Sequence, residues 1–200
     1  MSQASFRPSS TLAVFLIIFG VVGWISAFAL TLDKFALLED PNAVLNCNIS
    51  PLVQCGANLN SPEGAVFFDV PNPLWGLGGF VAPIAVGVGV LAGARFSRWF
   101  WIAFNVGVAG ALAFVIWLIA QSIFKLGTLC PWCMAVWSIT IPMFWAVTLY
   151  TLKSGVIPIG DRGRRIASAL YGWVPAITVA SYLVVAILAQ LRLNVLQSLL

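Results

Sequence analysis

Five long runs of uncharged, mostly apolar residues constrain the fold of this chain more than any other feature. Each run has at least the roughly 20 residues that a helix needs to cross the hydrocarbon core of a bilayer. Charged residues make up only 8% of the 200-residue chain and hydrophobic residues 61%, whereas soluble domains carry about 25% charged residues. The sequence therefore predicts an all-α integral membrane protein.

The polar segments between the runs divide the chain into two parts. The first part, 11–152, is expected to hold four spans and a long loop outside the membrane, and the second part, 153–200, a basic loop and a fifth span. The expected spans are 11–32, 75–94, 99–124, 129–152 and 166–191, and the long loop is 33–74. A cleavable signal peptide is the alternative for the first run, but that run is longer than a usual signal core. Small-residue patterns at Gly87, Gly89, Gly107 and Gly110 predict close helix packing.

The basic residues beside these runs predict the orientation of the protein. Seven lie on the cytoplasmic side if the N-terminus is inside, namely Arg7, Arg95, Arg98, Lys153, Arg162, Arg164 and Arg165. Only Lys34, Lys125 and Arg192 then lie outside, as the positive-inside rule requires. We expect a multi-pass protein of the cell membrane with a cytoplasmic N-terminus. The net charge of +4 belongs to these flanking residues, so the lipid bilayer is an expected partner and nucleic acid is not.

The four cysteines form two pairs in the sequence. Cys47 and Cys55 lie in the long loop, and Cys130 and Cys133 begin the fourth run. The predicted orientation places all four on the non-cytoplasmic face, where disulfides persist. Pro131 suits the first position of a helix, which makes Cys130 the expected cap residue. Because a helix N-terminus stabilises a thiolate, we expect a reactive dithiol, with Cys130 outermost and Cys133 one turn deeper.

Less specific roles remain open for these cysteines. The chain has no histidine, which excludes histidine-ligated metals and any Cys-His catalytic pair. Cys47 and Cys55 are eight positions apart, outside the usual spacing of a zinc knuckle, so no metal is expected. The alternative to a redox enzyme is a non-enzymatic membrane protein with structural disulfides or a thiolate metal site.

An ordered set of residues in this chain resembles the vitamin K epoxide reductase family. The set comprises Cys47, Cys55, Ser61, Asn72-Pro73-Leu74-Trp75-Gly76 and Cys130-Pro131-Trp132-Cys133. The chain is more closely similar to the bacterial, disulfide-forming homologues of this family, whose function is like that of DsbB. The resemblance covers about residues 11–152 and implies a four-helix transmembrane bundle around a quinone site, with a fifth transmembrane helix added.

The same resemblance implies a path for electrons. A secreted or periplasmic thioredoxin-fold protein similar to DsbA delivers electrons to Cys47, Cys55 then exchanges with Cys130, and Cys133 reduces a quinone. The implied activity is that of a quinone-dependent, disulfide-generating oxidoreductase that uses a menaquinone, ubiquinone or vitamin K type quinone. Because the sequence stops at Leu200 without a fused thioredoxin domain, the partner is expected to be a separate protein.

Four residues are expected to contact the quinone by this resemblance, namely Ser61, Asn72, Trp75 and Trp137. Each also has a plainer interpretation. Ser61, followed by Pro62 and Glu63, has the pattern of a cap that starts a short helix at the membrane interface. Asn72 suits a turn between two prolines, and Trp75 suits an interfacial anchor. Trp137 replaces the tyrosine that animal members often have, which argues against epoxide reduction and is compatible with stacking on a quinone.

Overall fold

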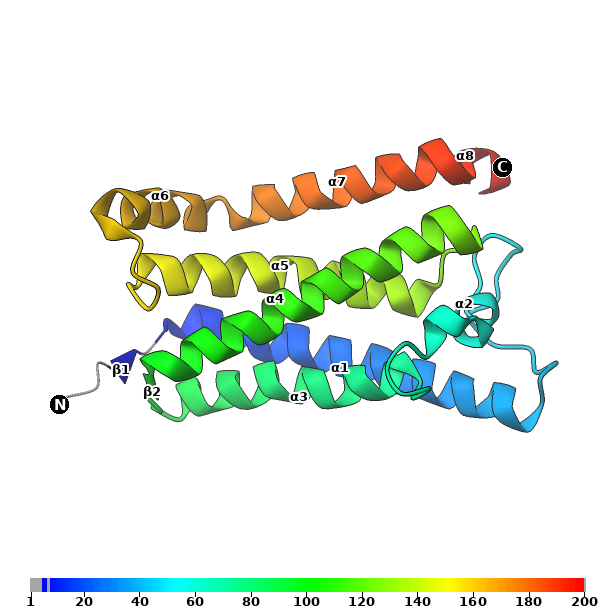
Figure 1. Cartoon of the computed structure of the whole chain (residues 1–200), viewed down its shortest axis with the longest axis horizontal. Helices are drawn as coiled ribbons and strands as arrows, with labels where there is room; N and C mark the ends of the chain where they lie inside the picture. The colour runs from blue at the N-terminus through cyan, green and yellow to red at the C-terminus, as the bar shows by residue number, and fades with distance from the viewer. Residues whose placement is uncertain (1–4, 7, 200) are drawn as a thin grey trace.

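The computed structural model describes residues 5, 6 and 8–199 of the chain. Within them, five helices are long and apolar enough to cross a membrane, as the sequence predicts. These are α1 (Ser10–Glu39), α3 (Asn72–Leu91), α4 (Arg98–Ala120), α5 (Pro131–Lys153) and α7 (Val174–Leu193). The described strands are the two-residue β1 (Ser5–Phe6) and β2 (Phe96–Ser97), which pair antiparallel. The prediction of an all-α membrane protein is confirmed (Figure 1).

The first four long helices form a bundle, and the fifth lies beside it. α1 and α3 lie side by side, α4 crosses them at an angle, and α5 packs on both α1 and α4 (Figure 1). α7 packs on α5 and on the end of α4. Only 11% of the most apolar window of α7 is buried, against 50% for α5. Most of the fifth helix therefore lies outside the bundle core, although Ala189 packs in one hydrophobic cluster with Trp137 and Cys133.

Glycines set the close approach of α1 to α3. A Cβ atom added at Gly87 would lie 2.6 Å from the carbonyl oxygen of Ala13, and one at Gly23 would lie 2.5 Å from the ring of Phe80. Larger side chains would push these helices apart. Gly107 and Gly110 differ from the prediction, because a Cβ atom added at either would have nothing within 4 Å. These two glycines of α4 therefore do not mediate close helix packing.

Two helix boundaries near the long loop differ from the expected ones. α1 continues beyond residue 32 to Glu39, because Lys34 finds a partner in the loop, donating to the carbonyl oxygen of Leu59 at 2.8 Å. α3 begins at Asn72 rather than at residue 75 and has a proline in its first turn. Proline is tolerated there because the first N–H groups of a helix have no partner within the helix. The segment that connects the two helices is consequently shorter than predicted.

The predicted fifth span, 166–191, is two helices in the structure. α6 (Gly160–Gly172) packs on the end of α5, and α7 starts at Val174 after a break at Trp173. Pro175 stands in the first turn of α7 and lacks the N–H that would continue α6 through the break. Much of the segment predicted as a basic loop is therefore helical. A last short helix, α8 (Val195–Leu199), follows α7.

α4 does not end as a regular helix. It passes into a π-helical segment, η2 (Gln121–Leu126), which ends at Gly127 with φ of 69°. The predicted end was residue 124. α5 then begins at Pro131 rather than at residue 129, so a short extended connection joins the two helices. Such π-helical turns change which side chains face a neighbour, and they are frequent at functional sites.

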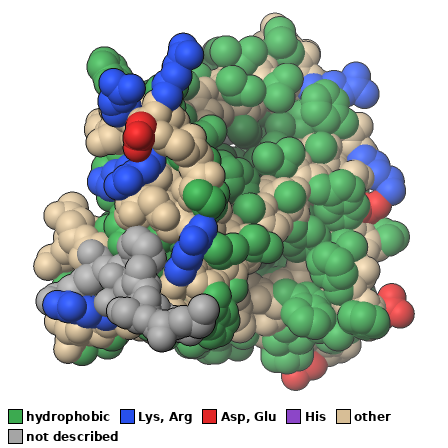
Figure 2. Space-filling view, turned by 60° about the vertical axis from the view of Figure 1, so that its left-hand side comes forward, with side chains coloured by type: hydrophobic (Ala, Val, Ile, Leu, Met, Phe, Trp, Pro, Cys, Tyr) green, Lys and Arg blue, Asp and Glu red, His purple; other side chains and the backbone are tan. Residues whose placement is uncertain are grey.

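The charged side chains are distributed unequally between the two ends of the bundle. Lys and Arg side chains gather at the end formed by β2 and α6, opposite the long loop (Figure 2). The described members of this group are Arg95, Arg98, Lys153, Arg162, Arg164 and Arg165. Arg7 lies outside the described residues. The first and last described segments, β1 and α8, lie at opposite ends of the molecule (Figure 1).

Candidate active site

Cys47 and Cys55 form a disulfide in the loop between α1 and α3, with their Cα atoms 5.7 Å apart. The side chain of Asn48 organises the chain around it, because its Oδ1 accepts from the N–H of Cys55 at 3.0 Å and from that of Gly56 at 3.3 Å. These bonds start the short helix α2 (Gly56–Asn60). Leucines from α1, the loop and α2 bury both sulfur atoms in an apolar cluster.

Cys130 and Cys133 are both free thiols at the start of α5. Cys130 is the N-cap residue and Pro131 the first helical residue, as predicted, and the Cys130 Sγ accepts from the N–H of Cys133 at 3.3 Å. A hydrogen bond from the Cys133 side chain lowers the pKa of the Cys130 thiol, and the N–H groups of Cys133 and Trp132 act in the same direction against burial. A lowered thiol pKa raises the fraction of thiolate, which is the reactive form.

The two pairs meet through Cys55 and Cys130, whose sulfur atoms lie 3.3 Å apart. The backbone produces this contact. The N–H of Gln54 donates to the carbonyl oxygen of Leu129 at 3.1 Å, and the N–H of Leu129 donates to that of Leu52 at 2.8 Å. The residues just before each cysteine are therefore tied together as a short parallel bridge, which sets the two sulfur atoms side by side.

A side chain that the sequence did not single out fixes the same junction. Asn58 of α2 accepts from the Ser122 hydroxyl at 2.8 Å and donates to the Thr128 hydroxyl at 2.9 Å. It thus joins the loop to η2 and to the connection before α5. An asparagine in a polar loop usually serves a local turn, so nothing in the sequence distinguished Asn58 from its neighbours.

The expected order of exposure of the helix cysteines is wrong in one respect. Cys130 was expected to be the outer, accessible sulfur, but its side chain is 0% exposed because the loop disulfide covers it. Cys133 is half-buried and lines a pocket among the helices. Cys130 is therefore accessible to Cys55 and closed to solvent.

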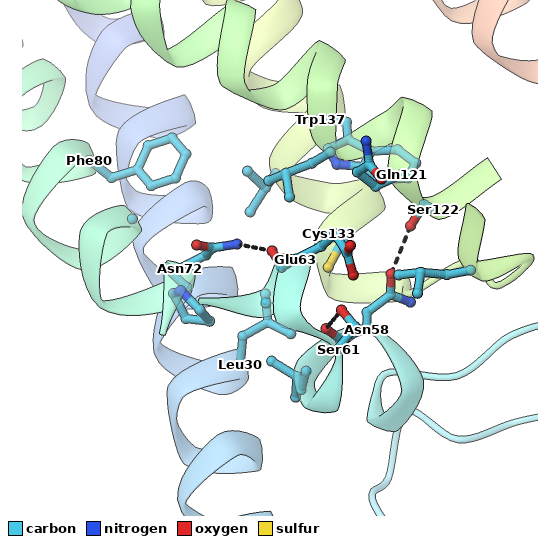
Figure 3. A pocket seen from close by; sticks show the side chains of 18 residues that line it. Leu30, Asn58, Ser61, Glu63, Asn72, Phe80, Gln121, Ser122, Cys133 and Trp137 are labelled. Atoms are coloured by element: carbon cyan, nitrogen blue, oxygen red, sulfur yellow. Dashed lines mark hydrogen bonds between the residues drawn. The ribbon is translucent and has the colours of Figure 1, made fainter. Parts of the chain in front are cut away.

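This pocket, here called the thiol pocket, has a volume of about 100 Å³. Its walls are mostly apolar, and it brings together three of the four predicted quinone contacts beside Cys133, namely Ser61, Asn72 and Trp137 (Figure 3). Trp75 does not line it and is 48% exposed. Sequence patterns did not single out four polar lining residues, Asn58, Glu63, Gln121 and Ser122.

Ser61 and Asn72 shape the edge of the thiol pocket. The prediction that the Ser61 side chain caps a helix is wrong. Its hydroxyl does not cap η1 (Pro62–Gly64) but donates to the carbonyl oxygen of Asn58 at 2.9 Å. Asn72 donates to the carbonyl oxygen of Glu63 at 2.6 Å and accepts from the N–H of Val66 at 3.1 Å. The expected interfacial helix is therefore a single 3-10 turn that Asn72 fastens to α3.

A larger pocket adjoins the thiol pocket on the side of α3 and α4. This apolar pocket has a volume of about 480 Å³, and Trp75 and Gly107 are among its lining residues. The two pockets share four lining residues, Gly76, Phe80, Leu118 and Val136. A cavity of this volume and apolar lining is typical of small-molecule sites.

An ion pair lies at the edge of the thiol pocket. Lys125 of η2 donates to Oε1 of Glu63. This hydrogen bond is the main cause that holds the pKa of the Glu63 carboxyl below its ordinary value. The sequence predicts Glu63 only as an acid in a first turn and Lys125 only as a charge outside the membrane. Neither prediction indicates that the two side chains form an ion pair across 62 positions.

One group of possible metal ligands occurs among the described residues, formed by Asp33, Cys47 and Cys55. Asp33 Oδ2 lies 3.3 Å from the Cys47 sulfur. Both cysteines are engaged in the disulfide, so neither offers a thiolate to a metal while that bond is intact.

The comparison with known families agrees with this geometry. No curated protein matches the chain significantly. The sequence model described as the vitamin K epoxide reductase family matches residues 14–148, a range that includes all four cysteines and the residues of both pockets. This is well over half of the chain, and we conclude that the chain belongs to the vitamin K epoxide reductase family of membrane oxidoreductases.

Proposed function

We propose that the protein is a quinone-dependent thiol oxidoreductase that makes disulfides for a secreted thioredoxin-fold partner similar to DsbA. Electrons pass from the partner to the Cys47/Cys55 pair, then to the Cys130/Cys133 pair, and finally to a quinone. The observation that carries this proposal is the 3.3 Å contact between the sulfur atoms of Cys55 and Cys130. This contact connects the Cys130/Cys133 pair at the start of α5 to the Cys47/Cys55 pair in the loop.

The arrangement corresponds to one stage of such a relay. The loop pair is a disulfide and the helix pair is a dithiol, so both electrons are on the helix pair beside the thiol pocket. The preceding step would be attack by the reduced Cys55 thiolate on the Cys130–Cys133 disulfide, followed by attack of Cys47 on the mixed disulfide. Each exchange breaks one S–S bond and forms another, and the two steps move two electrons.

The chemistry of the thiol pocket suits a quinone ring. Its walls are apolar, the Trp137 indole offers a face for stacking, and Asn72 makes only one of its two possible N–H donations among the described residues. A bound quinone would supply the two-electron acceptor next to Cys133. Trp137 and Asn72 would hold the ring, and the cover of the loop would keep water from the helix thiols.

The apolar pocket suits the isoprenoid tail of such a quinone. It joins the thiol pocket at four shared residues and runs between α3, α4 and α5 within the membrane-spanning region. In this proposal Trp75 contacts the tail and not the ring. The native quinone would then be a lipid-soluble one, of the menaquinone, ubiquinone or vitamin K type.

The orientation of the protein follows from the charge distribution. The basic end formed by β2 and α6 is cytoplasmic by the positive-inside rule, which leaves the four cysteines on the extracytoplasmic face. A membrane-impermeant thiol reagent added from the cytoplasmic side should therefore modify none of the four cysteines. Modification from that side would contradict this part of the proposal.

Purified protein in lipid nanodiscs, given a reduced thioredoxin-fold protein and a short-chain quinone, tests the proposed function. We expect one quinone to be reduced for each partner dithiol oxidised, followed by quinone absorbance and thiol titration. Cys130→Ala should reduce the rate to background, because the relay loses its connection to the loop. Ser138→Ala is the control, because this hydroxyl donates within its own helix.

The alternative function makes the opposite prediction for the same experiment. A protein with purely structural thiols would consume no quinone, and Cys130→Ala would behave like the wild type. That result would overturn the enzymatic proposal.

A further inference from the structure

The carboxylate of Glu63 is the most unusual polar group at the thiol pocket. Its residue is only 8% exposed although it lies in a loop. Oε1 accepts from Lys125, but Oε2 is buried without a hydrogen-bond partner among the described residues. A buried carboxylate oxygen without a partner is unfavourable in a stable fold, so this atom needs a functional or ligand-based explanation.

The position of Glu63 is fixed by contacts on both sides of its side chain. Its carbonyl oxygen accepts from Asn72 at 2.6 Å, and its carboxylate is held by Lys125. The side chain points into the pocket that Cys133 also lines (Figure 3). The free Oε2 therefore lies in the same small cavity as the thiol that would reduce the quinone.

Glu63 is charged at neutral pH, and its free oxygen lies in the pocket beside the thiol. The hydrogen bond from Lys125 keeps the pKa of the carboxyl low, so the group is ionised at neutral pH. The Lys125 side chain is itself 63% exposed and places the ion pair at the boundary between the pocket and water. A carboxylate with one occupied and one free oxygen can accept a proton on the free one.

We infer that Glu63 carries the proton of the Cys133 thiol to the quinone, an inference that rests on the proposed function. Oxidation of the Cys130 and Cys133 thiols to a disulfide releases two electrons and two protons, and reduction of a quinone to a quinol consumes two of each. Oε2 takes one proton from Cys133 Sγ and returns it to a quinol oxygen. When the loop opens, the proton of Cys130 leaves to the aqueous face, from which the other quinol oxygen draws its proton, so Glu63 ends as a carboxylate.

Glu63→Gln separates this role from a structural one. Glutamine can still accept the hydrogen bond from Lys125 but cannot accept a proton. We expect kcat for quinone reduction to fall about 100-fold, the range of general acid–base catalysis, with little change in KM. Glu63→Asp should be faster than Glu63→Gln, because it retains an acid.

A second readout follows the thiols without relying on activity. After a limiting amount of reduced partner is added, acid quenching and mass tagging show which cysteines are reduced. Glu63→Gln should accumulate the Cys130/Cys133 dithiol, because exchange with the loop proceeds and the later step is slow. If Glu63 only positions the loop, the exchange itself fails and reduced Cys47 and Cys55 accumulate, which would overturn the inference.

The outcomes for this inference and for the proposed function are distinguishable. If the wild type reduces no quinone, the proposed function fails. If the wild type is active and Glu63→Gln matches it, or if Glu63→Asp is as slow as Glu63→Gln, only the role of Glu63 fails. Glu39→Gln is the matched control, since it removes an exposed acid at the end of α1 and should match the wild type in both readouts.

Discussion

The two cysteine pairs differ in how the fold holds them. Cys130 and Cys133 occupy the first turn of a bundle helix that packs on α1 and α4. Cys47 and Cys55 lie in a loop with one short helix and one 3-10 turn, tied to the bundle near Cys130 by the bridge to Leu129 and by Asn58. Segments with few such ties open locally at a small fraction of the global unfolding free energy. In the proposed relay, the helix pair is therefore the fixed site and the loop pair is the mobile carrier.

The burial of Cys47 shows why the carrier has to move. Its side chain is 5% exposed beneath the leucines of the loop cluster, so a folded partner cannot reach its sulfur in this arrangement. A disulfide exchange requires direct contact between the attacking sulfur and its target. The proposed function therefore requires the loop to open toward the partner and to close onto Cys130 in alternation. The following changes test this difference between the pairs, from the largest expected effect to the smallest.

Cys133→Ala should convert the contact between the pairs into a covalent bond. Attack by Cys130 on Cys55 then yields a Cys55–Cys130 disulfide, which persists because no resolving thiol remains on the helix. We expect this bond in most of the protein, with Cys47 as a free thiol, by peptide mapping under acid quench. Cys130→Ala is the control. Recovery of only the Cys47–Cys55 bond from Cys133→Ala would contradict the relay order.

Asn58→Ala should make the carrier open more often. It removes the two side-chain hydrogen bonds that join the loop to the bundle. Each is worth about 1 kcal/mol, so the open population should rise roughly tenfold or more. Because Cys130 is fully buried in the closed form, its alkylation by a maleimide should accelerate by a similar factor. Asn60→Ala is the matched control, since among the described residues the Asn60 side chain accepts just one long bond, of 3.4 Å, from Lys34. Equal rates in both variants would show that Asn58 does not hold the loop.

Gly107→Leu should affect quinone binding beside the helix cysteines and leave the loop pair unchanged. The added side chain enters the apolar pocket and should raise KM for a long-tailed quinone roughly 10-fold, leaving a short-chain quinone unaffected. Gly110→Leu is the control, because Gly110 also has open space but does not line the pocket. Thiol exchange between the pairs should be unchanged in both. An equal effect on both quinones would argue against a tail in this pocket.

Lys125→Met should have the smallest effect, on stability at neutral pH. Glu63 has a folded pKa below its ordinary value of 4.5, so its ion pair stabilises the fold above that pH and this contribution is lost as the pH falls through the lower, folded pKa. We expect the melting temperature of the variant to be lower by roughly 1–3 °C at pH 7. The two proteins should converge once the pH falls below the folded pKa of Glu63. A difference that persists in acid would mean that Lys125 acts through packing.

Local patterns predicted much of this molecule. The five spans follow from runs of apolar residues, and the cap at Cys130 follows from Pro131 at the next position. The sequence failed where a residue depends on a distant partner. α1 continues past Lys34, whose ammonium group donates a hydrogen bond to the carbonyl oxygen of Leu59. The roles of Asn58 and Glu63 require partners on η2, more than 60 positions away. Periodicity and spacing carry no information about such partners.

The π-helical turn η2 makes the junction sensitive to chain length. A π-helix contains one residue more for each turn than an α-helix, and each residue rotates an α-helix by about 100°. Deleting one residue from Gln121–Leu126 would wind the segment into a regular helix and turn Ser122 and Lys125 away from Asn58 and Glu63. The loop and the ion pair would both lose their attachment, although no cysteine had changed. The additional residue in the π-helical turn thus orients Ser122 and Lys125 toward their partners in the redox loop.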